Sequence, residues 1–399
     1  MSHKKYKKLI IISGIVIFAI VCVFVSSYFF SISFDSTKSQ SINLIKNSES
    51  TSIVSPEIDT NSVPLPISHI ATPENVKAIY ISAWVAGSAK HMQRIYNLLD
   101  TTELNAIVID VKDSTGRVSF HSNNTLINEL GSSEKRIADI NKLIEDLHAK
   151  NIYVIGRVSV FQDPYMTKKM PDWAVKRKSD GAVWKDRKGL SFLDPANKAV
   201  WDYIVAVGQN AYSVGFDEIN FDYIRYPSDG NIKDINYRLA EGKTRASNIE
   251  DFFIYLHDNM KKDIDIPTSA DLFGLVTTSV GGDDMGIGQI LEKALPHFDF
   301  IAPMAYPSHF AIGWNGYKNP ASKPYEVVNL TMKKAAERTI AMGYTPSKIR
   351  PWLQDFDMGA TYTKEMVRAQ IKATNDAGLN SWMLWDPKNI YTKDALELN

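Results

Sequence analysis

Residues 215–227 read GFDEINFDYIRYP, and the fold prediction starts from this stretch. Apolar and polar residues alternate over Glu218–Ile224, which is the two-residue period of a β-strand. The flanking segments Ala199–Tyr212 and Ile249–Lys261 have the apolar spacing of amphipathic helices. Another strand pattern, Thr268–Gly274, follows the second helix. Strands that alternate with helices in this order predict a parallel sheet.

The same alternation continues over residues 76–387 and contains eight predicted strands. That number fits one (β/α)₈ TIM barrel, with a doubly wound sheet as the structural alternative. Three further helices are predicted at Ile137–Ala149, Val327–Met342 and Lys364–Ala377. The eight predicted strands are Ala78–Trp84, Ala106–Val111, Tyr153–Val160, Glu218–Ile224, Thr268–Gly274, Phe300–Tyr306, Arg350–Gln354 and Ser381–Trp385.

The N-terminal part of the sequence predicts export. Leu9–Phe30 is an almost unbroken apolar run preceded by four lysines, which predicts a transmembrane signal-anchor with the rest of the chain outside the cell membrane. A cleaved signal peptide is the alternative, and it would leave the barrel secreted. Residues 31–73 are rich in Ser, Thr and Asn and predict a flexible linker. The predicted domains are therefore the anchor at 1–30, the linker at 31–73 and the barrel at 74–399.

Composition narrows the classes of partner and cofactor. Net charge is zero, and the first 30 residues contain four of the lysines and no acidic residue, so the remainder is mildly acidic. This balance argues against a nucleic-acid partner. Cys22 is the one cysteine, which excludes an intramolecular disulfide and a cysteine-based metal site. The eight histidines lack metal-ligand spacing, so no metal and no cofactor are expected.

Polar and aromatic residues recur where the predicted strands end. In a barrel of this kind, active sites lie at the carboxyl ends of the strands. We therefore expect such residues to hold substrate, with loop hydrogen bonding or helix capping as the alternative for Asp110 and Asp386. The expected substrate-binding residues at these ends are Asp110, Arg157, Arg225, Tyr306, Gln354, Trp385 and Asp386.

The strand in the opening stretch carries three inward polar residues. Because side chains alternate along a strand, Glu218, Asn220 and Asp222 are predicted to point toward the barrel axis, while Ile219, Phe221 and Tyr223 face the helices. Polar groups inside a barrel are costly unless they are hydrogen-bonded or functional. Glu218 and Asn220 are therefore expected to bind substrate beside Asp222. The alternative is a hydrogen-bonded network with Arg157, Lys112 or Arg225.

The stretch resembles the strand-four motif of alpha-amylase-type barrels, Gly-hydrophobic-Asp-Gly-hydrophobic-Arg-hydrophobic-Asp. Its last Asp is the catalytic nucleophile of those enzymes, and this resemblance implies the same role for Asp222. Glu218 and Asn220 replace the amylase Gly and Arg, and Asp271 stands where amylases have a Glu acid, so the resemblance does not extend to amylase specificity. The segment Val76–Pro387 is also similar to a family of glycosyl hydrolase domains of unknown function, which share motifs like FDYIRYP. Tyr306 and Trp385 resemble positions that line chitinase-like barrels.

Glycoside hydrolysis needs two carboxyl groups, which we predict to be Asp222 and Asp271. One protonates the leaving oxygen, and the other attacks the anomeric carbon or activates water. Carboxyls about 5–5.5 Å apart indicate retention and about 6.5–9.5 Å inversion, and the sequence leaves both open. The long segment Gln162–Asp194 contains Trp173 and Trp184, which are expected to stack on polysaccharide unless they form the core of a small subdomain.

Three functions follow from these residues as hypotheses. The first is a glycosidase acting outside the membrane on a cell-envelope or extracellular polysaccharide. The second is a catalytically inactive surface barrel that binds glycan. The third is a polysaccharide deacetylase, against which the missing His/Asp metal cluster counts.

Overall fold

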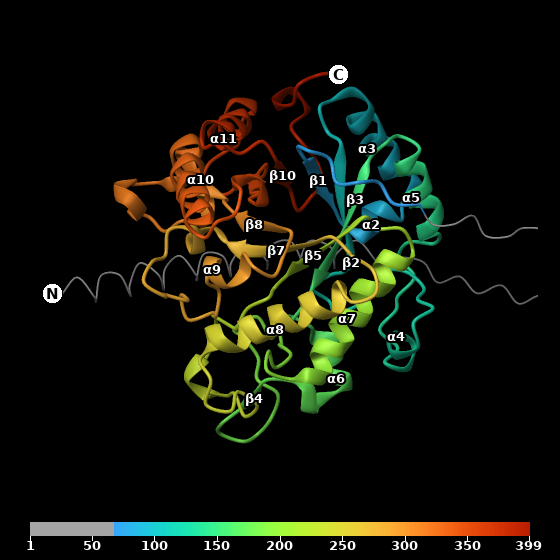
Figure 1. The fold of residues 1–399 in the computed structure, drawn as a ribbon, viewed down its shortest axis with the longest axis vertical. Coiled ribbons are helices and arrows are strands. Elements are labelled where there is room, and N and C mark those ends of the chain that lie inside the picture. Colours follow the sequence, from blue (N-terminus) through green and yellow to red (C-terminus); the bar gives the residue numbers. More distant parts are fainter. Residues whose placement is uncertain (1–67) are drawn as a thin grey trace, which may run out of the picture.

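The structure, a computed structural model, describes residues 68–399 and has a closed barrel of parallel strands at its centre (Figure 1). The first and last barrel strands pair directly, with Lys77 opposite Trp382. This pairing confirms the eight-stranded parallel barrel and excludes the doubly wound sheet. The barrel strands in chain order are β1 (Lys77–Ile81), β2 (Ala106–Lys112), β3 (Tyr153–Ser159), β5 (Glu218–Asp222), β7 (Thr268–Phe273), β8 (Phe300–Met304), β9 (Trp352–Gln354) and β10 (Trp382–Trp385).

Helices surround the strands, and all five predicted helices are present (Figure 1). In α5 (Ile140–His148), the buried residues Ile140, Leu143, Ile144 and Leu147 recur with the helical period. Beyond β10, the described chain forms only the 3₁₀ turn η8 (Lys393–Ala395), so that side has no long outer helix. The other α-helices are α2 (Ala83–Ala86), α3 (Ala89–Thr101), α4 (Thr125–Glu129), α6 (Pro164–Lys169), α7 (Lys198–Ser213), α8 (Arg245–Met260), α9 (Leu291–Ala294), α10 (Pro324–Ala341) and α11 (Lys364–Asp376).

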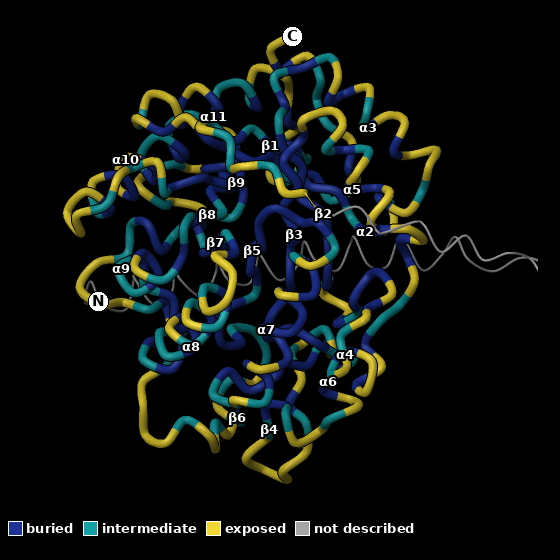
Figure 2. The backbone as a smooth tube through the Cα atoms, turned by 45° about the vertical axis from the view of Figure 1, so that its right-hand side comes forward, coloured by how far each residue is buried: buried dark blue, intermediate teal, exposed yellow. Residues whose placement is uncertain are grey.

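The barrel wall separates two apolar layers, and the strands are the most buried part of the chain (Figure 2). Inside the barrel, Ala78, Val108, Ile155 and Met383 belong to one cluster. The larger cluster lies between strands and helices. Every residue of β2 and β3 is buried, as expected for parallel strands covered on both faces. Polar groups that enter this interior therefore need partners there.

Several strand ends differ from the prediction by one to three residues, and two of them have a clear local cause. β1 ends at Ile81, because the Ser82 side chain accepts a hydrogen bond from the Val85 amide and begins α2, which contains Trp84. β5 ends at Asp222, because Tyr223 takes a left-handed conformation with φ of 54°. Tyr223 therefore does not continue the helix-facing row, as the sequence had predicted. The turn leaves Asp222 as the last strand residue, at the carboxyl end of the barrel.

The segment after β3 leaves the barrel and forms a small subdomain. It contains α6, η1 (Pro171–Trp173) and β4 (Lys176–Arg177). β4 pairs antiparallel with β6 (Ile235–Asn236), which comes from the segment after β5. The long excursion predicted at Gln162–Asp194 is thus tied to the connection that follows Asp222.

The predicted anchor at 1–30 and the predicted linker up to residue 67 lie outside the described residues. Within residues 68–399, no helix has the length and apolar character needed to cross a membrane. His69, Ile70 and Thr72 lie before the predicted domain boundary at residue 74, yet they contact the barrel. These residues pack with the barrel and are not part of a free linker.

Asp217 fastens this entering segment to the amino-terminal end of the barrel. Its Oδ1 accepts the Ile70 amide at 2.7 Å. Its Oδ2 contacts His148 Nε2 at 3.0 Å and accepts the Val154 amide at 2.8 Å. Burial alone would raise the pKa of Asp217, but the hydrogen bonds from His148, His69 and the Val154 amide hold this pKa below its usual range.

We expect Asp217 to stabilise the fold above its unfolded-state pKa of about 3.9 and to lose that contribution as pH falls through its lower folded-state pKa. Asp217→Asn should therefore lower the free energy of unfolding by about 1–3 kcal/mol near neutral pH, since buried hydrogen bonds are lost. The difference from wild type should shrink below about pH 4. Urea unfolding between pH 3 and pH 7 measures both curves, and parallel curves across that range would contradict this role.

Candidate active site

Arg157 joins two carboxylates at the carboxyl end of the barrel. From β3, its Nη2 and Nε donate to Asp222 Oδ2 at 2.5 and 3.1 Å. Its Nη1 donates to Asp110 Oδ1 at 2.6 Å. The Tyr223 amide donates to the other Asp222 oxygen at 2.6 Å, and the Tyr80 hydroxyl donates to the other Asp110 oxygen at 2.6 Å. The Asp222 side chain is therefore held in a fixed orientation by a guanidinium and a backbone amide.

Asp271 on the neighbouring strand β7 has a different environment. Its Oδ1 accepts hydrogen bonds from Asn220 Nδ2 and Trp352 Nε1, both at 2.8 Å. Burial and then the negative charge of Asp222 raise the pKa of Asp271 well above its usual range, against the opposing effects of Asn220, Arg157 and Trp352. Asp271 therefore holds its proton at pH values where an ordinary aspartate has lost it.

The two carboxyls occupy equivalent levels of adjacent strands. Phe221 on β5 is opposite Ala270 on β7, so the next residues, Asp222 and Asp271, follow each other in register. Asp222 is 6% exposed and Asp271 is 2% exposed. An arginine-bound carboxyl and a buried carboxyl with a raised pKa thus lie side by side at the end of the barrel where chemistry is expected.

An aromatic group borders the carboxyls. Trp385 from β10 stacks on Tyr80 from β1 with ring centroids 3.9 Å apart, and it meets Trp352 edge-on at 5.5 Å. The Arg157 guanidinium lies 5.0 Å from the Trp385 ring. Tyr306 belongs to the same environment, because burial and then the charges of Asp271 and Asp222 raise its pKa. Flat aromatic rings therefore line one side of the carboxyl pair.

Residues 78–391 match the model of a family described as "Putative glycosyl hydrolase domain". The chain belongs to this family. No curated protein matches the sequence.

Three solved structures have a similar fold. A hypothetical protein from Ruminiclostridium thermocellum is 35% identical over 48% of this chain and 96% of its own, with a TM-score of 0.45. Amy13B from Eubacterium rectale is 11% identical over 80% of this chain and 67% of its own, with a TM-score of 0.49. The glycoside hydrolase domain of PelA from Pseudomonas aeruginosa is 9% identical over 82% of this chain and 98% of its own, with a TM-score of 0.44.

Several residues of this glycosyl hydrolase domain that the sequence placed at the site have structural partners instead. Glu218 is fully buried and binds Arg350 Nη1 at 3.0 Å, Ser269 Oγ at 2.6 Å and the Tyr153 hydroxyl at 3.1 Å. This is the hydrogen-bonded alternative, although Arg350 was not among the expected partners. Lys112 binds Asp163 at 2.9 Å and does not join the Asp222 network.

Three further residues that were expected to bind substrate form hydrogen bonds to loop backbone. Gln354 accepts the Ser308 amide at 3.1 Å and donates to the Phe356 carbonyl at 2.8 Å. Asp386 accepts the amide of Ile390 at 2.7 Å, as the loop-bonding alternative predicts. Arg225 donates to the Tyr226 carbonyl at 3.2 Å and lies 5.0 Å from the Phe273 ring. These side chains fix the loops around the site.

Sequence reasoning missed two aromatic residues that bind carboxyls of the site, Tyr80 with Asp110 and Trp352 with Asp271. Both face the barrel interior from predicted strands, but inward aromatic residues usually belong to the core. Trp352 lies two residues before Gln354, so the two-residue strand period places them on the same face.

Within residues 68–399, histidine, cysteine and acidic side chains form no group of three or more that could hold a metal.

Trp184 corrects the expectation of an exposed ring. It is 1% exposed and packs with Val175, Phe192 and Ile235 in the core of the small subdomain. Its Nε1 donates to the Asn231 carbonyl at 3.0 Å. A ring enclosed in this way cannot stack on a glycan. Trp173 is half-buried near Tyr203, so its stacking role stays a prediction.

We expect Trp184→Ala to destabilise the subdomain by about 3–5 kcal/mol, because a large buried ring is removed. Trp184→Phe is the matched control, since it retains most of the volume and loses only the indole donor. Limited proteolysis at the 176–192 loops and thermal melting measure the effect. An unchanged melting temperature for the alanine variant would show that the ring is not core.

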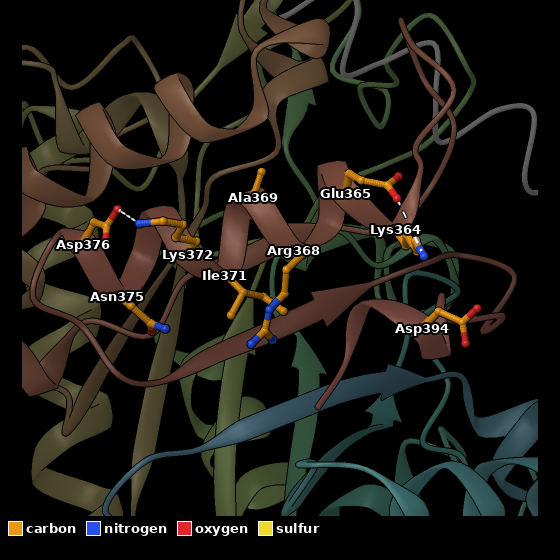
Figure 3. A pocket seen from close by; sticks show the side chains of 9 residues that line it. All are labelled: Lys364, Glu365, Arg368, Ala369, Ile371, Lys372, Asn375, Asp376 and Asp394. Carbon is orange, nitrogen blue, oxygen red and sulfur yellow. Dashed lines mark hydrogen bonds and ion pairs between the residues drawn. The ribbon is translucent and has the colours of Figure 1, made fainter. Parts of the chain in front are cut away.

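A surface hollow of about 600 Å³ lies away from this site, on the outer side of α11 beside Asp394 of η8 (Figure 3). Six of its nine lining residues are charged, and Lys372 pairs there with Asp376. No residue of the predicted site contributes to it. The hollow belongs to the outer helix layer.

Proposed function

We propose that this chain is a glycoside hydrolase that cleaves O-glycosyl bonds of a cell-envelope or extracellular polysaccharide. The observation that carries this proposal is the pair of carboxyls on neighbouring strands, Asp222 bound by the Arg157 guanidinium and Asp271 buried beside it. Asp222, oriented by Arg157, is the nucleophile of this proposal, and Asp271, whose pKa is raised by burial and then by the charge of Asp222, is the acid. Family membership supports a glycosidase, and the predicted signal-anchor supports a substrate outside the cytoplasmic membrane.

The strand register favours a retaining mechanism. Neighbouring strands lie about 4.8 Å apart, so residues that follow each other in register on adjacent strands bring their carboxyls close. Retaining enzymes need about 5–5.5 Å, whereas inverting enzymes leave room for a water between carboxyls about 6.5–9.5 Å apart. Proton NMR of the first-formed product, before mutarotation, measures the anomer. Inverted product would assign Asp222 as a base in place of a nucleophile.

The remaining groups divide the work of binding. Asp110, through its fixed orientation against Arg157 and Tyr80, presents a carboxylate to sugar hydroxyls. Trp385, half-exposed on the Tyr80 ring, presents an apolar face to the sugar. Asn220 and Trp352 hold Asp271 in place. Tyr306 adds a buried aromatic ring near both Asp222 and Asp271.

The test is hydrolysis by the full chain. It should be incubated with a panel of envelope glycans and with cellulose, chitin, amylose and dextran, and released reducing ends should be counted against the Asp222→Asn variant. Release by wild type alone supports the proposal. The alternative is a catalytically inactive glycan-binding barrel, which the extensive pairing of Asp222 with Arg157 would suit. Binding without release by wild type would favour it.

A further inference from the structure

Trp84 is an exposed tryptophan that is not part of the aromatic group around Asp222 and Asp271. It lies in α2, directly after β1, and is 59% exposed. A lone exposed apolar residue on a loop is ordinary and needs no function. Trp84 differs because its surroundings hold the ring in one place.

The first feature is a guanidinium on the indole. The Arg136 guanidinium lies 4.9 Å from the Trp84 ring centroid. It is fixed there by Asp113 at 2.6 Å from Nη1, Thr115 Oγ1 at 2.8 Å from Nη2 and Glu134 Oε2 at 2.7 Å from Nε. The Arg136 side chain is almost fully buried by these contacts. It therefore covers part of the indole, and the exposed part faces solvent.

The second feature is the backbone that carries the ring. Gly87 ends α2 so close to the 134–136 segment that a Cβ there would lie 2.0 Å from the Arg136 carbonyl oxygen. At the other end of α2, the Ser82 amide donates to Asn389 Oδ1 at 3.0 Å. A four-residue helix is thus anchored on both sides. The chain positions an exposed aromatic ring rigidly, where a mobile loop would let it fold onto the surface.

The third feature is continuity with the carboxyl pair. Arg157 links Asp222 to Asp110 at the end of β2, and Asp113 follows three residues later. Burial raises the pKa of Asp110, Arg157 opposes this, and the charge of Asp113 adds to the rise, so the two carboxylates are close enough to interact. Acids and guanidiniums therefore form a row that leads outward from the carboxyl pair: Asp222, Arg157, Asp110, Asp113, Arg136 and finally Trp84.

We propose that Trp84 is a binding platform for a sugar ring of a polysaccharide whose scissile bond lies at Asp222 and Asp271. This inference rests on the proposed hydrolase function and deepens it, because it assigns a long chain as substrate. A pyranose ring presents a C–H face to the exposed indole. The half-exposed Glu134 carboxylate, which binds the same Arg136 guanidinium, accepts hydrogen bonds from the hydroxyls of this sugar or the next.

The test compares long and short substrates with the full chain. Trp84→Ala should raise KM about 10-fold for a polysaccharide that the wild type cleaves, as expected for the loss of one aromatic stacking contact. Turnover of a short aryl glycoside should stay unchanged, since it does not reach Trp84. Trp84→Phe retains a ring and should restore most of the affinity. Ile340→Ala is the matched control, because Ile340 is 58% exposed on the outer helix α10.

Equilibrium binding to insoluble cellulose and chitin, and to soluble amylose and dextran, separates this inference from the proposed function. If wild type binds one of these without cleaving it and Trp84→Ala loses that binding, the platform stands and hydrolysis fails. If wild type cleaves a polymer and Trp84→Ala has the same KM, the platform is wrong and hydrolysis stands. An equal loss on polymer and aryl glycoside also overturns the platform. Absence of both binding and cleavage overturns both.

Discussion

Asp222→Asn is expected to abolish hydrolysis while the barrel stays folded. Asparagine keeps the size and shape of the side chain, but its amide cannot attack the anomeric carbon. Removing a catalytic nucleophile lowers kcat by roughly 10⁴- to 10⁶-fold. The variant also loses the charge that Arg157 contacts, which should cost about 1–3 kcal/mol of stability, because Arg157 keeps Asp110 as a partner. Initial rates should be measured at a temperature where thermal melting shows both proteins folded.

Asp110→Asn is the matched control for this variant. Asp110 is the other carboxylate bound by Arg157, so both substitutions remove the charge of a partner of the same guanidinium. We expect Asp110→Asn to raise KM and retain measurable turnover, because the proposed role of Asp110 is to bind sugar hydroxyls and not to attack the reacting carbon. If both variants lose turnover equally, Asp222 acts only by holding Arg157. Normal turnover in Asp222→Asn would remove the nucleophile assignment altogether.

The barrel could be predicted because its signals are local. Short buried strands and amphipathic helices each carry their own period, and all eight strands and five helices were placed within a few residues. The strand ends were less predictable. Tyr223 continues the alternating pattern in sequence, yet it adopts a left-handed conformation that no pattern records. Closure was also not readable from the sequence, because it depends on the pairing of β1 with β10.

The candidate site was predictable only where strand alternation decided it. Asp222, Asp271, Arg157 and Asp110 do come together, because all four face inward near the carboxyl ends of their strands. The pairing of Glu218 with Arg350 spans 132 residues of sequence, so the pattern around Glu218 could not reveal it.

Tryptophans show the same limit. Trp184 is core and Trp84 is exposed, although sequence reasoning took Trp184 for the exposed ring and Trp84 for a strand residue. Burial of an aromatic residue in an irregular segment depends on which distant residues cover it. For Trp184 these are Phe192 and Ile235, and the second of them belongs to the connection after β5.

Asp271→Asn is expected to separate substrates by their leaving groups. General acid catalysis contributes roughly 10²- to 10⁴-fold, so cleavage of a polysaccharide, whose leaving alcohol needs a proton, should slow by that factor. In an aryl glycoside with an acidic phenol, the phenolate leaves without protonation. Cleavage of this bond should therefore slow far less. Asn220 and Trp352 can still hydrogen-bond the asparagine side chain, so the barrel should melt near the wild-type temperature.

The pH profile gives an independent test of the same assignment. Burial and then the charge of Asp222 raise the pKa of Asp271, so the acid is protonated below this raised value and loses its proton as pH rises through it. Wild-type activity on polysaccharide should therefore fall on the alkaline side at that pKa, and Asp271→Asn should lack this fall with an aryl glycoside. In a retaining mechanism, azide should partly restore Asp271→Gly by attacking the glycosyl-enzyme, with a glycosyl azide as product. Equal slowing of both substrate classes, with the alkaline fall intact, would show that another group donates the proton.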